Sequence, residues 1–93
     1  MSITRINKFE AREGRAQDLH AFLKSIVPSI ERSPGCKACQ VLQNQENKNE
    51  FVVLEVWESI AAHRASAQAI PAEEITRVMD MLVNPPGGSY YAA

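Results

Sequence analysis

The sequence predicts an α+β fold with the element order β-α-β-β-α-β, the ferredoxin-like arrangement, in which the strands form an antiparallel sheet. Three observations support this prediction. Some stretches alternate side chains with the period of a strand, others repeat hydrophobic residues with the period of a helix, and turn-forming residues separate them. With 93 residues, the chain is expected to form one domain, residues 1–93.

The first two elements are predicted within residues 2–32. Residues 2–10 alternate between two faces and contain β-branched side chains, which indicates a strand. Residues 15–32 repeat hydrophobic side chains at intervals of three and four, which indicates an amphipathic helix. Pro28 lies within this helix and should kink it or loosen its last turn, because proline removes one backbone donor.

A hairpin is predicted in the middle of the chain. Residues 36–44 and 50–57 are the predicted strands, and the polar, Asn-rich residues 45–49 suit the connection between them. Residues 51–57 are hydrophobic on both faces, whereas an antiparallel strand with one face in water should alternate. We therefore expect the helices of this chain to cover one face of that strand and something else to cover the other.

The last elements are defined by helix-forming and helix-breaking residues. The alanine-rich residues 60–69 predict a helix, which Pro71 interrupts before helical spacing resumes over residues 73–82. Residues 84–88, Asn-Pro-Pro-Gly-Gly, end that helix. Residues 89–93 carry two tyrosines and can form a short last strand.

The composition argues against several kinds of partner. Ten Lys and Arg against eleven Asp and Glu give a net charge of -1, so no nucleic-acid partner is expected, because phosphate binding needs a basic surplus. The hydrophobic runs are far shorter than the roughly 20 residues that cross a bilayer, so no membrane partner is expected either. Two cysteines are too few for a disulfide scaffold, and the expected location is the reducing cytoplasm.

Several motifs follow one another along the chain. Pro-Gly-Cys at residues 34–36 leads into the second strand, Glu55 and Trp57 close the third, and His63 and Ser66 follow in the next helix. Together they resemble the antibiotic biosynthesis monooxygenase (ABM) family, in particular its small quinol-monooxygenase-type members, over essentially the whole chain. The resemblance implies a homodimer, in which the sheets of two ferredoxin-like subunits pack face to face as a dimeric α/β barrel. It also implies oxidation of a quinol-like or polycyclic aromatic substrate by O2, with no metal, haem, flavin or other cofactor held by the protein.

Three residues are candidates for the catalytic site: His63, Trp57 and Asn7. Cofactor-free oxygenation needs a group that accepts a proton from the reduced substrate, and His63, with an ordinary pKa near ~6.5, suits that role. Trp57 offers an indole N–H and a flat wall for an aromatic ring, and Asn7 can orient a substrate hydroxyl or stabilise an oxyanion. Each also has a simpler interpretation: a solvated helix residue for His63, a core side chain for Trp57, and a structural hydrogen bond for Asn7.

The site should also exclude water, which keeps the radical pair formed with O2 together. The side chains expected to bind the substrate and exclude water are Phe22, Ile26, Phe51 and Met79. The predicted function is a cofactor-independent monooxygenase acting on a quinol or related aromatic small molecule. The alternative is a non-catalytic dimeric module that binds a small hydrophobic ligand, and the two differ in whether His63, Trp57 and Asn7 converge on one cavity.

Other reactive side chains are predicted to be structural. Cys36 and Cys39 form a C-x-x-C pattern, but at the start of a strand they should point to opposite faces, so neither a redox pair nor a zinc site is expected. His20 lies off the hydrophobic stripe of its helix and is expected to be exposed. Arg77 is expected to pair with Asp80 in solvent.

A haem site is not expected either. Relatives of similar fold that degrade haem use a histidine on a helix as the iron ligand. In this chain the corresponding position, about one turn beyond His63, is Ala67 or Gln68, so the iron ligand is missing.

Overall fold

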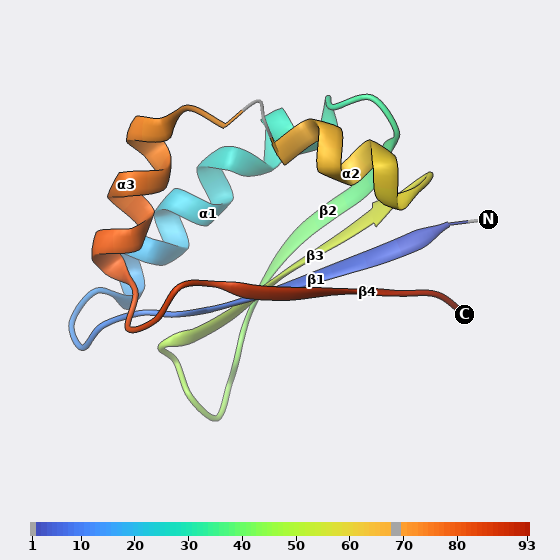
Figure 1. Ribbon diagram of the computed structural model, residues 1–93. Coiled ribbons are helices and arrows are strands. Elements are labelled where there is room, and N and C mark those ends of the chain that lie inside the picture. The colour runs from blue at the N-terminus through green and yellow to red at the C-terminus, as the bar shows by residue number, and fades with distance from the viewer. Residues whose placement is uncertain (1, 68–69) are drawn as a thin grey trace.

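The computed structural model describes residues 2–67 and 70–93 (Figure 1). In these residues the chain forms, in order, β1 (Ile3–Glu10), α1 (Ala16–Glu31), β2 (Cys36–Gln43), β3 (Glu50–Trp57), α2 (Ile60–Ala67), α3 (Ala72–Met81) and β4 (Gly87–Tyr91). The strands make an antiparallel sheet in the order β2-β3-β1-β4, and the helices lie on one face of it (Figure 1). The predicted ferredoxin-like arrangement is confirmed, with its second helical segment divided in two.

Two prolines have different effects on the helices. Pro71 precedes α3 with φ -59° and ψ 142°, an extended conformation that separates α3 from α2 as the sequence predicts. Positions 68 and 69 of the predicted helix lie outside the described residues. Pro28 is accommodated inside α1, which continues to Glu31 before Gly35, with φ 87°, turns the chain into β2.

The register of the sheet decides which side chains meet the helices. β1 pairs with β3 so that Arg5 lies opposite Glu55 and Asn7 opposite Val53, and β4 pairs with β1 so that Tyr90 lies opposite Arg5. Side chains opposite one another project from the same face of a sheet. These five therefore point to the helix layer, where Glu55 and Val53 are buried.

The opposite face of the sheet is covered by none of the described helices (Figure 1). Its hydrophobic side chains are Ile6, Leu42, Val52, Leu54 and Val56. Along β3 the half-buried residues Val52, Leu54 and Val56 alternate with the buried residues Phe51, Val53, Glu55 and Trp57 of the helix face. The two-sided character predicted for this strand is confirmed, and the open face of the sheet is hydrophobic.

The main hydrophobic core lies between α1, α3 and one end of the sheet. Its buried members include Leu19, Phe22, Leu23, Phe51, Val53, Val78, Met81 and Leu82. Each such side chain contributes about 1.5–3 kcal/mol when it is fully removed from water. Trp57 is fully buried at the other end of β3 and does not belong to this cluster. The helix face of the sheet thus has a hydrophobic end and, around Trp57, a polar end.

A β-bulge near the start of β2 changes the placement of the two cysteines. The register shifts between Cys36 and Ala38, so that Cys36 lies opposite Trp57 and Cys39 opposite Glu55. Both cysteines therefore project to the helix face, and the expectation that they point to opposite faces is wrong, because the extra residue of a bulge reverses the alternation. Burial raises the pKa of Cys39 to about 12 and also raises that of Cys36, so both are neutral thiols at pH 7.

Candidate active site

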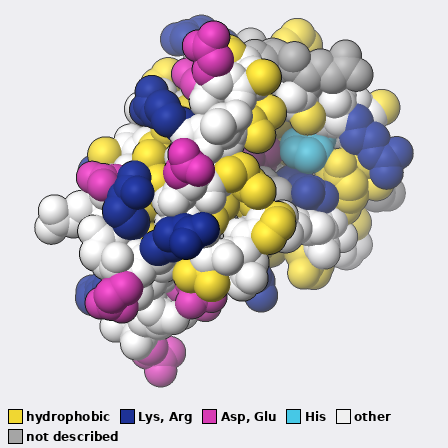
Figure 2. Space-filling view, turned by 60° about the vertical axis from the view of Figure 1, so that its left-hand side comes forward, with side chains coloured by type: hydrophobic (Ala, Val, Ile, Leu, Met, Phe, Trp, Pro, Cys, Tyr) yellow, Lys and Arg dark blue, Asp and Glu magenta, His cyan; other side chains and the backbone are white. Residues whose placement is uncertain are grey.

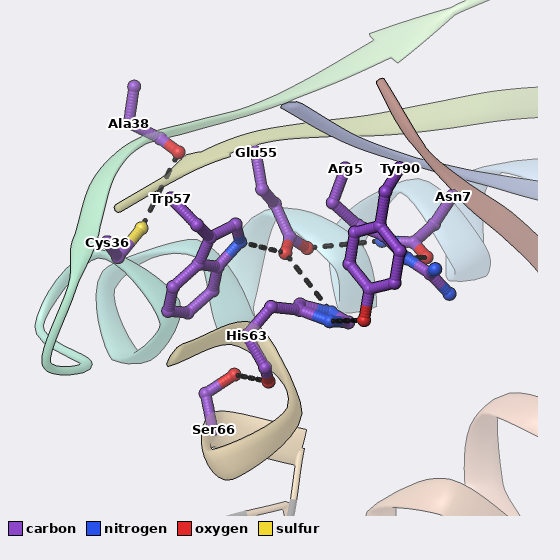
Figure 3. Close-up of polar contacts among 9 residues, drawn as sticks. All are labelled: Arg5, Asn7, Cys36, Ala38, Glu55, Trp57, His63, Ser66 and Tyr90. Atoms are coloured by element: carbon purple, nitrogen blue, oxygen red, sulfur yellow. Dashed lines mark hydrogen bonds and ion pairs between the residues drawn. The ribbon is translucent and has the colours of Figure 1, made fainter. Parts of the chain in front are cut away.

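A buried carboxylate lies at the centre of the polar end of the sheet (Figure 3). Glu55 is only 5% exposed, and both of its side-chain oxygens accept a hydrogen bond: Trp57 Nε1 donates to Oε1 at 2.9 Å, and Asn7 Nδ2 donates to Oε2 at 3.3 Å. Glu55 and Trp57 meet because residues i and i+2 of a strand project from the same face, and Asn7 reaches across from β1. The carboxylate is thereby held in one orientation.

Arg5 fixes the orientation of the Asn7 amide. Arg5 Nε donates to Asn7 Oδ1 at 2.9 Å, so the amide oxygen faces the guanidinium and the amide nitrogen faces Glu55. The guanidinium carbon of Arg5 also lies 4.6 Å from the ring centroid of Tyr90. Gly88 leaves room for these groups, because a Cβ at that position would overlap the Asn7 amide oxygen and the Arg5 guanidinium. The glycine in this part of β4 is a packing requirement of the site.

α2 brings His63 to the same place. Ser59 lies just before α2, and its carbonyl accepts a hydrogen bond from the N–H of His63. His63 Nδ1 lies 2.7 Å from the Tyr90 hydroxyl, and Nε2 lies 3.7 Å from Glu55 Oε1. The imidazole also packs edge-on against the Trp57 and Tyr90 rings, at centroid distances of 5.5 and 5.3 Å. With 16% of its side chain exposed, His63 lies neither in open solvent nor in a sealed core.

Burial moves the pKa values of Glu55 and His63 toward each other. Loss of water raises the pKa of Glu55, although the hydrogen bond from Trp57 and the charge of Arg5 oppose this. Loss of water, with Arg5 and Arg64 nearby, lowers the pKa of His63 below its ordinary value. The imidazole is therefore neutral at pH 7, when it can accept a proton.

The arrangement is suited to taking a proton from a bound acid. A neutral imidazole lies beside a carboxylate that would stabilise the imidazolium, and Arg5 and Arg64 add positive charge that favours a bound anion. Figure 2 shows a face of the molecule on which a histidine lies at the bottom of a hollow flanked by hydrophobic and basic side chains. The polar end of the sheet thus has the components of an acid–base site.

Residues 2–76 match the protein-family model described as antibiotic biosynthesis monooxygenase. The chain belongs to this family. The match includes β1, β3 and α2, which carry Asn7, Glu55, Trp57 and His63, and it ends before β4. Among curated protein sequences none matches the chain.

Solved structures share the fold of this ABM-family chain at low sequence identity. Rv0793 from Mycobacterium tuberculosis is 19% identical, with a TM-score of 0.85 over 100% of this chain and 95% of that one. A protein from Nitrosomonas europaea, assigned as an antibiotic biosynthesis monooxygenase, is 18% identical. The two structures align with a TM-score of 0.86 over 99% of this chain and 89% of that one. A variant of SnoaB, a cofactor-independent oxygenase from Streptomyces nogalater, is 19% identical. Its structure aligns with a TM-score of 0.81 over 99% of this chain and 92% of that one. These similarities establish a shared fold.

The three candidate catalytic residues lie together in the structure. His63, Trp57 and Asn7 surround Glu55, although they come from α2, β3 and β1. The N–H groups of Trp57 and Asn7 are both directed at the carboxylate, and Trp57 is fully buried. In this arrangement Trp57 and Asn7 therefore act on Glu55 rather than offering a free donor to a ligand.

The four hydrophobic residues expected to bind substrate do not lie together at the polar end. Phe22 and Phe51 belong to the main core, and Phe51 is six residues from Trp57 along β3, a span of roughly 20 Å. Ile26 lines a hollow of about 330 Å³ beside α1. Met79, on α3, is 37% exposed. Sequence spacing does not tell which end of the sheet a hydrophobic side chain covers.

Three residues of the site were missed by the sequence analysis: Glu55, Arg5 and Tyr90. The sequence does contain a signal for Glu55. It is the only carboxylate among the alternate residues of β3 that face the helices, and the others are hydrophobic. Arg5 projects from the same face of β1 as Asn7 and lies opposite Glu55 in the sheet. Tyr90 carries no such signal, because its place depends on β4 pairing with β1, which the local sequence does not encode.

Two further expectations about individual side chains are wrong. His20 is half-buried rather than exposed, with its ring 5.1 Å from the ring of Phe51. Arg77 lies over the aromatic ring of Phe22 rather than beside Asp80, with its guanidinium carbon 5.7 Å from the ring centroid. In both cases a hydrophobic ring of the core attracts the flat part of a polar side chain, which covers it from water.

Within residues 2–67 and 70–93, no three His, Cys, Asp or Glu side chains are grouped so that they could hold a metal ion. Over the same ranges, no helix has the length and hydrophobicity needed to cross a membrane. Of the two positions considered for an iron ligand, Ala67 ends α2 and Gln68 lies outside the described residues.

Proposed function

We propose that this ABM-family protein is a cofactor-independent monooxygenase that oxidises a quinol or a related aromatic small molecule with O2. The observation that carries the proposal is the position of His63, whose neutral imidazole is held between the Tyr90 hydroxyl and the buried Glu55 carboxylate. Family membership supports the reaction class, and SnoaB, which shares the fold, is described as a cofactor-independent oxygenase. The substrate class follows from the need for an acidic hydroxyl and an electron-rich ring.

The proposed reaction needs no electrons from outside the substrate. One hydroquinone and one O2 give one hydroxyquinone and one water. Two electrons come from conversion of a ring C–H bond to a C–O bond, and two come from oxidation of the hydroquinone to the quinone. One oxygen atom becomes a hydroxyl group on a ring carbon, and the other leaves as water with the two remaining protons.

His63 is the base that takes up the proton released by a substrate hydroxyl. A phenol with a pKa near ~10 is mostly neutral at pH 7, and its anion transfers an electron to O2 much more readily than the neutral form. General-base assistance of this kind typically contributes about 10²–10⁴-fold to a rate. Glu55 stabilises the imidazolium, while Trp57 and Asn7 orient Glu55 through their hydrogen bonds. The substrate anion and O2 then react while the site holds them together.

The proposal includes a homodimer formed through the open face of the sheet. The hydrophobic side chains of that face, Ile6, Leu42, Val52, Leu54 and Val56, have no helix over them among the described residues. Soluble monomers seldom expose a contiguous hydrophobic patch of this kind. A second copy placed face to face would cover it and would complete the dimeric α/β barrel.

The function is tested by oxygen uptake with a panel of reduced quinols and aromatic polyphenols, using the protein with and without a metal chelator. We expect uptake with at least one compound, unchanged by the chelator. His63→Ala should slow it by about ten-fold or more, while His20→Gln, which replaces the other histidine, should remain within two-fold. If no compound is oxidised, the proposal fails, and the non-catalytic dimeric module that binds a small hydrophobic ligand replaces it.

The dimer is tested by analytical ultracentrifugation at micromolar concentration. The parent should sediment at twice the 10.3 kDa mass of one chain. Leu54→Lys places a charge in the middle of the open face and should give a folded monomer, whereas Lys37→Ala, at an exposed position of β2, should leave the dimer intact. A parent that sediments as a 10.3 kDa species contradicts this part of the proposal.

A further inference from the structure

Neither ring nitrogen of His63 is free to meet a substrate directly. Nδ1 lies 2.7 Å from the Tyr90 hydroxyl, and Nε2 faces Glu55 Oε1 at 3.7 Å (Figure 3). The imidazole also packs nearly perpendicular to the Trp57 and Tyr90 rings, at interplanar angles of 73° and 78°. A substrate hydroxyl that approached His63 itself would have to displace Tyr90 or enter between His63 and the buried carboxylate.

The surroundings of His63 also decide which nitrogen carries the proton. Both oxygens of Glu55 accept hydrogen bonds, from Trp57 and from Asn7, so the carboxylate acts as an acceptor. The nitrogen that faces it, Nε2, is therefore the protonated one, and Nδ1 carries the lone pair. In that tautomer the Tyr90 hydroxyl donates a hydrogen bond to Nδ1.

Tyr90 keeps a free side for a ligand. Its oxygen donates one hydrogen bond to His63 and can accept another. Tyr90 lies on β4, the edge strand of the sheet, and is only half-buried. The guanidinium carbons of Arg5 and Arg64 lie 4.6 and 5.9 Å from its ring centroid, so an anion formed at this hydroxyl or beside it meets two positive charges.

We propose that Tyr90 is the catalytic residue that receives the proton of the substrate hydroxyl and passes its own proton to His63. This inference rests on the proposed monooxygenase function. The substrate O–H bond breaks and its proton joins the Tyr90 oxygen, while the Tyr90 O–H bond breaks and that proton joins Nδ1. Tyr90 ends neutral, His63 becomes an imidazolium beside Glu55, and the substrate becomes an anion beside Arg5.

The first test compares two neighbouring tyrosines in oxygen uptake with a quinol that the parent oxidises. Tyr90→Phe removes the proposed transfer group and should lower kcat by about ten-fold or more. Tyr91→Phe removes the hydroxyl of the next residue, which projects from the opposite face of the sheet and is 52% exposed, and should remain within two-fold. If Tyr90→Phe is as fast as Tyr91→Phe, the inference about Tyr90 is wrong while the proposed function stands. If the parent oxidises no quinol, both fall.

The second test separates proton transfer from a merely structural role. Because Tyr90 acts through His63, the double variant Tyr90→Phe/His63→Ala should be no slower than His63→Ala alone. A further multiplicative loss in the double variant would contradict the relay. ¹⁵N NMR of the imidazole in the parent should show Nε2 protonated and Nδ1 as a hydrogen-bond acceptor. A proton on Nδ1 would reverse the hydrogen bond to Tyr90 and overturn the inference.

Discussion

Replacing Glu55 with glutamine removes the charge beside His63 while keeping nearly the same shape. In the parent, Glu55 Oε1 lies 3.7 Å from His63 Nε2, and both side chains are largely buried. Two opposite charges at that distance attract by about 4 kcal/mol at an effective dielectric constant near 20. Since part of the imidazole remains exposed, we use the smaller effect usual for such pairs, a pKa change of about 1–3 units. Glu55→Gln should therefore lower the pKa of His63 by that amount.

The same change should slow the reaction. Each pKa unit corresponds to about 1.36 kcal/mol of lost stabilisation of the imidazolium. If about half of the proton has been transferred in the transition state, the loss in kcat is about 3- to 30-fold. NMR titration of the histidine signal measures the pKa, in a His20→Gln background so that only His63 is observed, and oxygen uptake measures kcat. An unchanged or higher pKa of His63 in Glu55→Gln would refute the role given to the carboxylate.

Folding serves as the control in this experiment. The glutamine oxygen can still accept the N–H of Trp57, but its NH₂ group then faces Asn7 Nδ2, and Asn7 cannot reverse its amide without turning Nδ2 toward Arg5. One buried donor thus loses its acceptor, which costs about 1–3 kcal/mol. Removal of a buried charge offsets part of this, because burial disfavours the ionised form of Glu55, as its raised pKa indicates. The net loss in the free energy of unfolding should stay below about 2 kcal/mol at pH 7, measured by urea denaturation at a fixed protein concentration.

Three further predictions concern other parts of the site. Gly88→Ala should lower kcat several-fold because its Cβ displaces Asn7, whereas the Cβ of Gly87→Ala meets no neighbour and should leave kcat unchanged. Equal rates of oxygen uptake in the two variants would contradict this prediction. Replacing Cys36 and Cys39 by alanine should keep uptake within a few-fold, since both are neutral thiols; loss of activity with an unchanged circular dichroism spectrum would assign them a chemical role. Because the pKa of His63 is lowered, kcat should stay constant from pH 8 down to about 6.5 and should decrease only at lower pH, where the imidazole is protonated. A decrease in kcat that begins above pH 7 would contradict this prediction.

The sequence determined the order of elements because the signals involved are local. Alternation over residues 2–10, helical spacing over residues 15–32 and the break at Pro71 each depend on neighbours within one or two turns of chain. The hydrophobic character of both faces of residues 51–57 also predicted an open face, which the structure has. Such features can be read without knowing the register of the sheet.

The site could be predicted only in part, because its contacts depend on register. His63, Trp57 and Asn7 were identified from their chemistry and from the family resemblance, but the group that joins them, Glu55, was not. The hydrogen bond between His63 and Tyr90 joins residues 27 positions apart through the pairing of β4 with β1. The bulge in β2 and the distance between the hydrophobic core and Trp57 likewise follow from pairing that local patterns do not specify.

The central claim, oxygenation without a cofactor, is tested most directly by mass spectrometry of the product formed under ¹⁸O₂ from a reduced quinol. The protein should first be treated with chelator and shown to be free of metal and flavin. We predict one ¹⁸O atom in each hydroxyquinone formed, one O2 consumed for each, and loss of the labelled product in His63→Ala. Formation of unlabelled quinone with an equal amount of hydrogen peroxide would show a two-electron oxidation and would contradict the account.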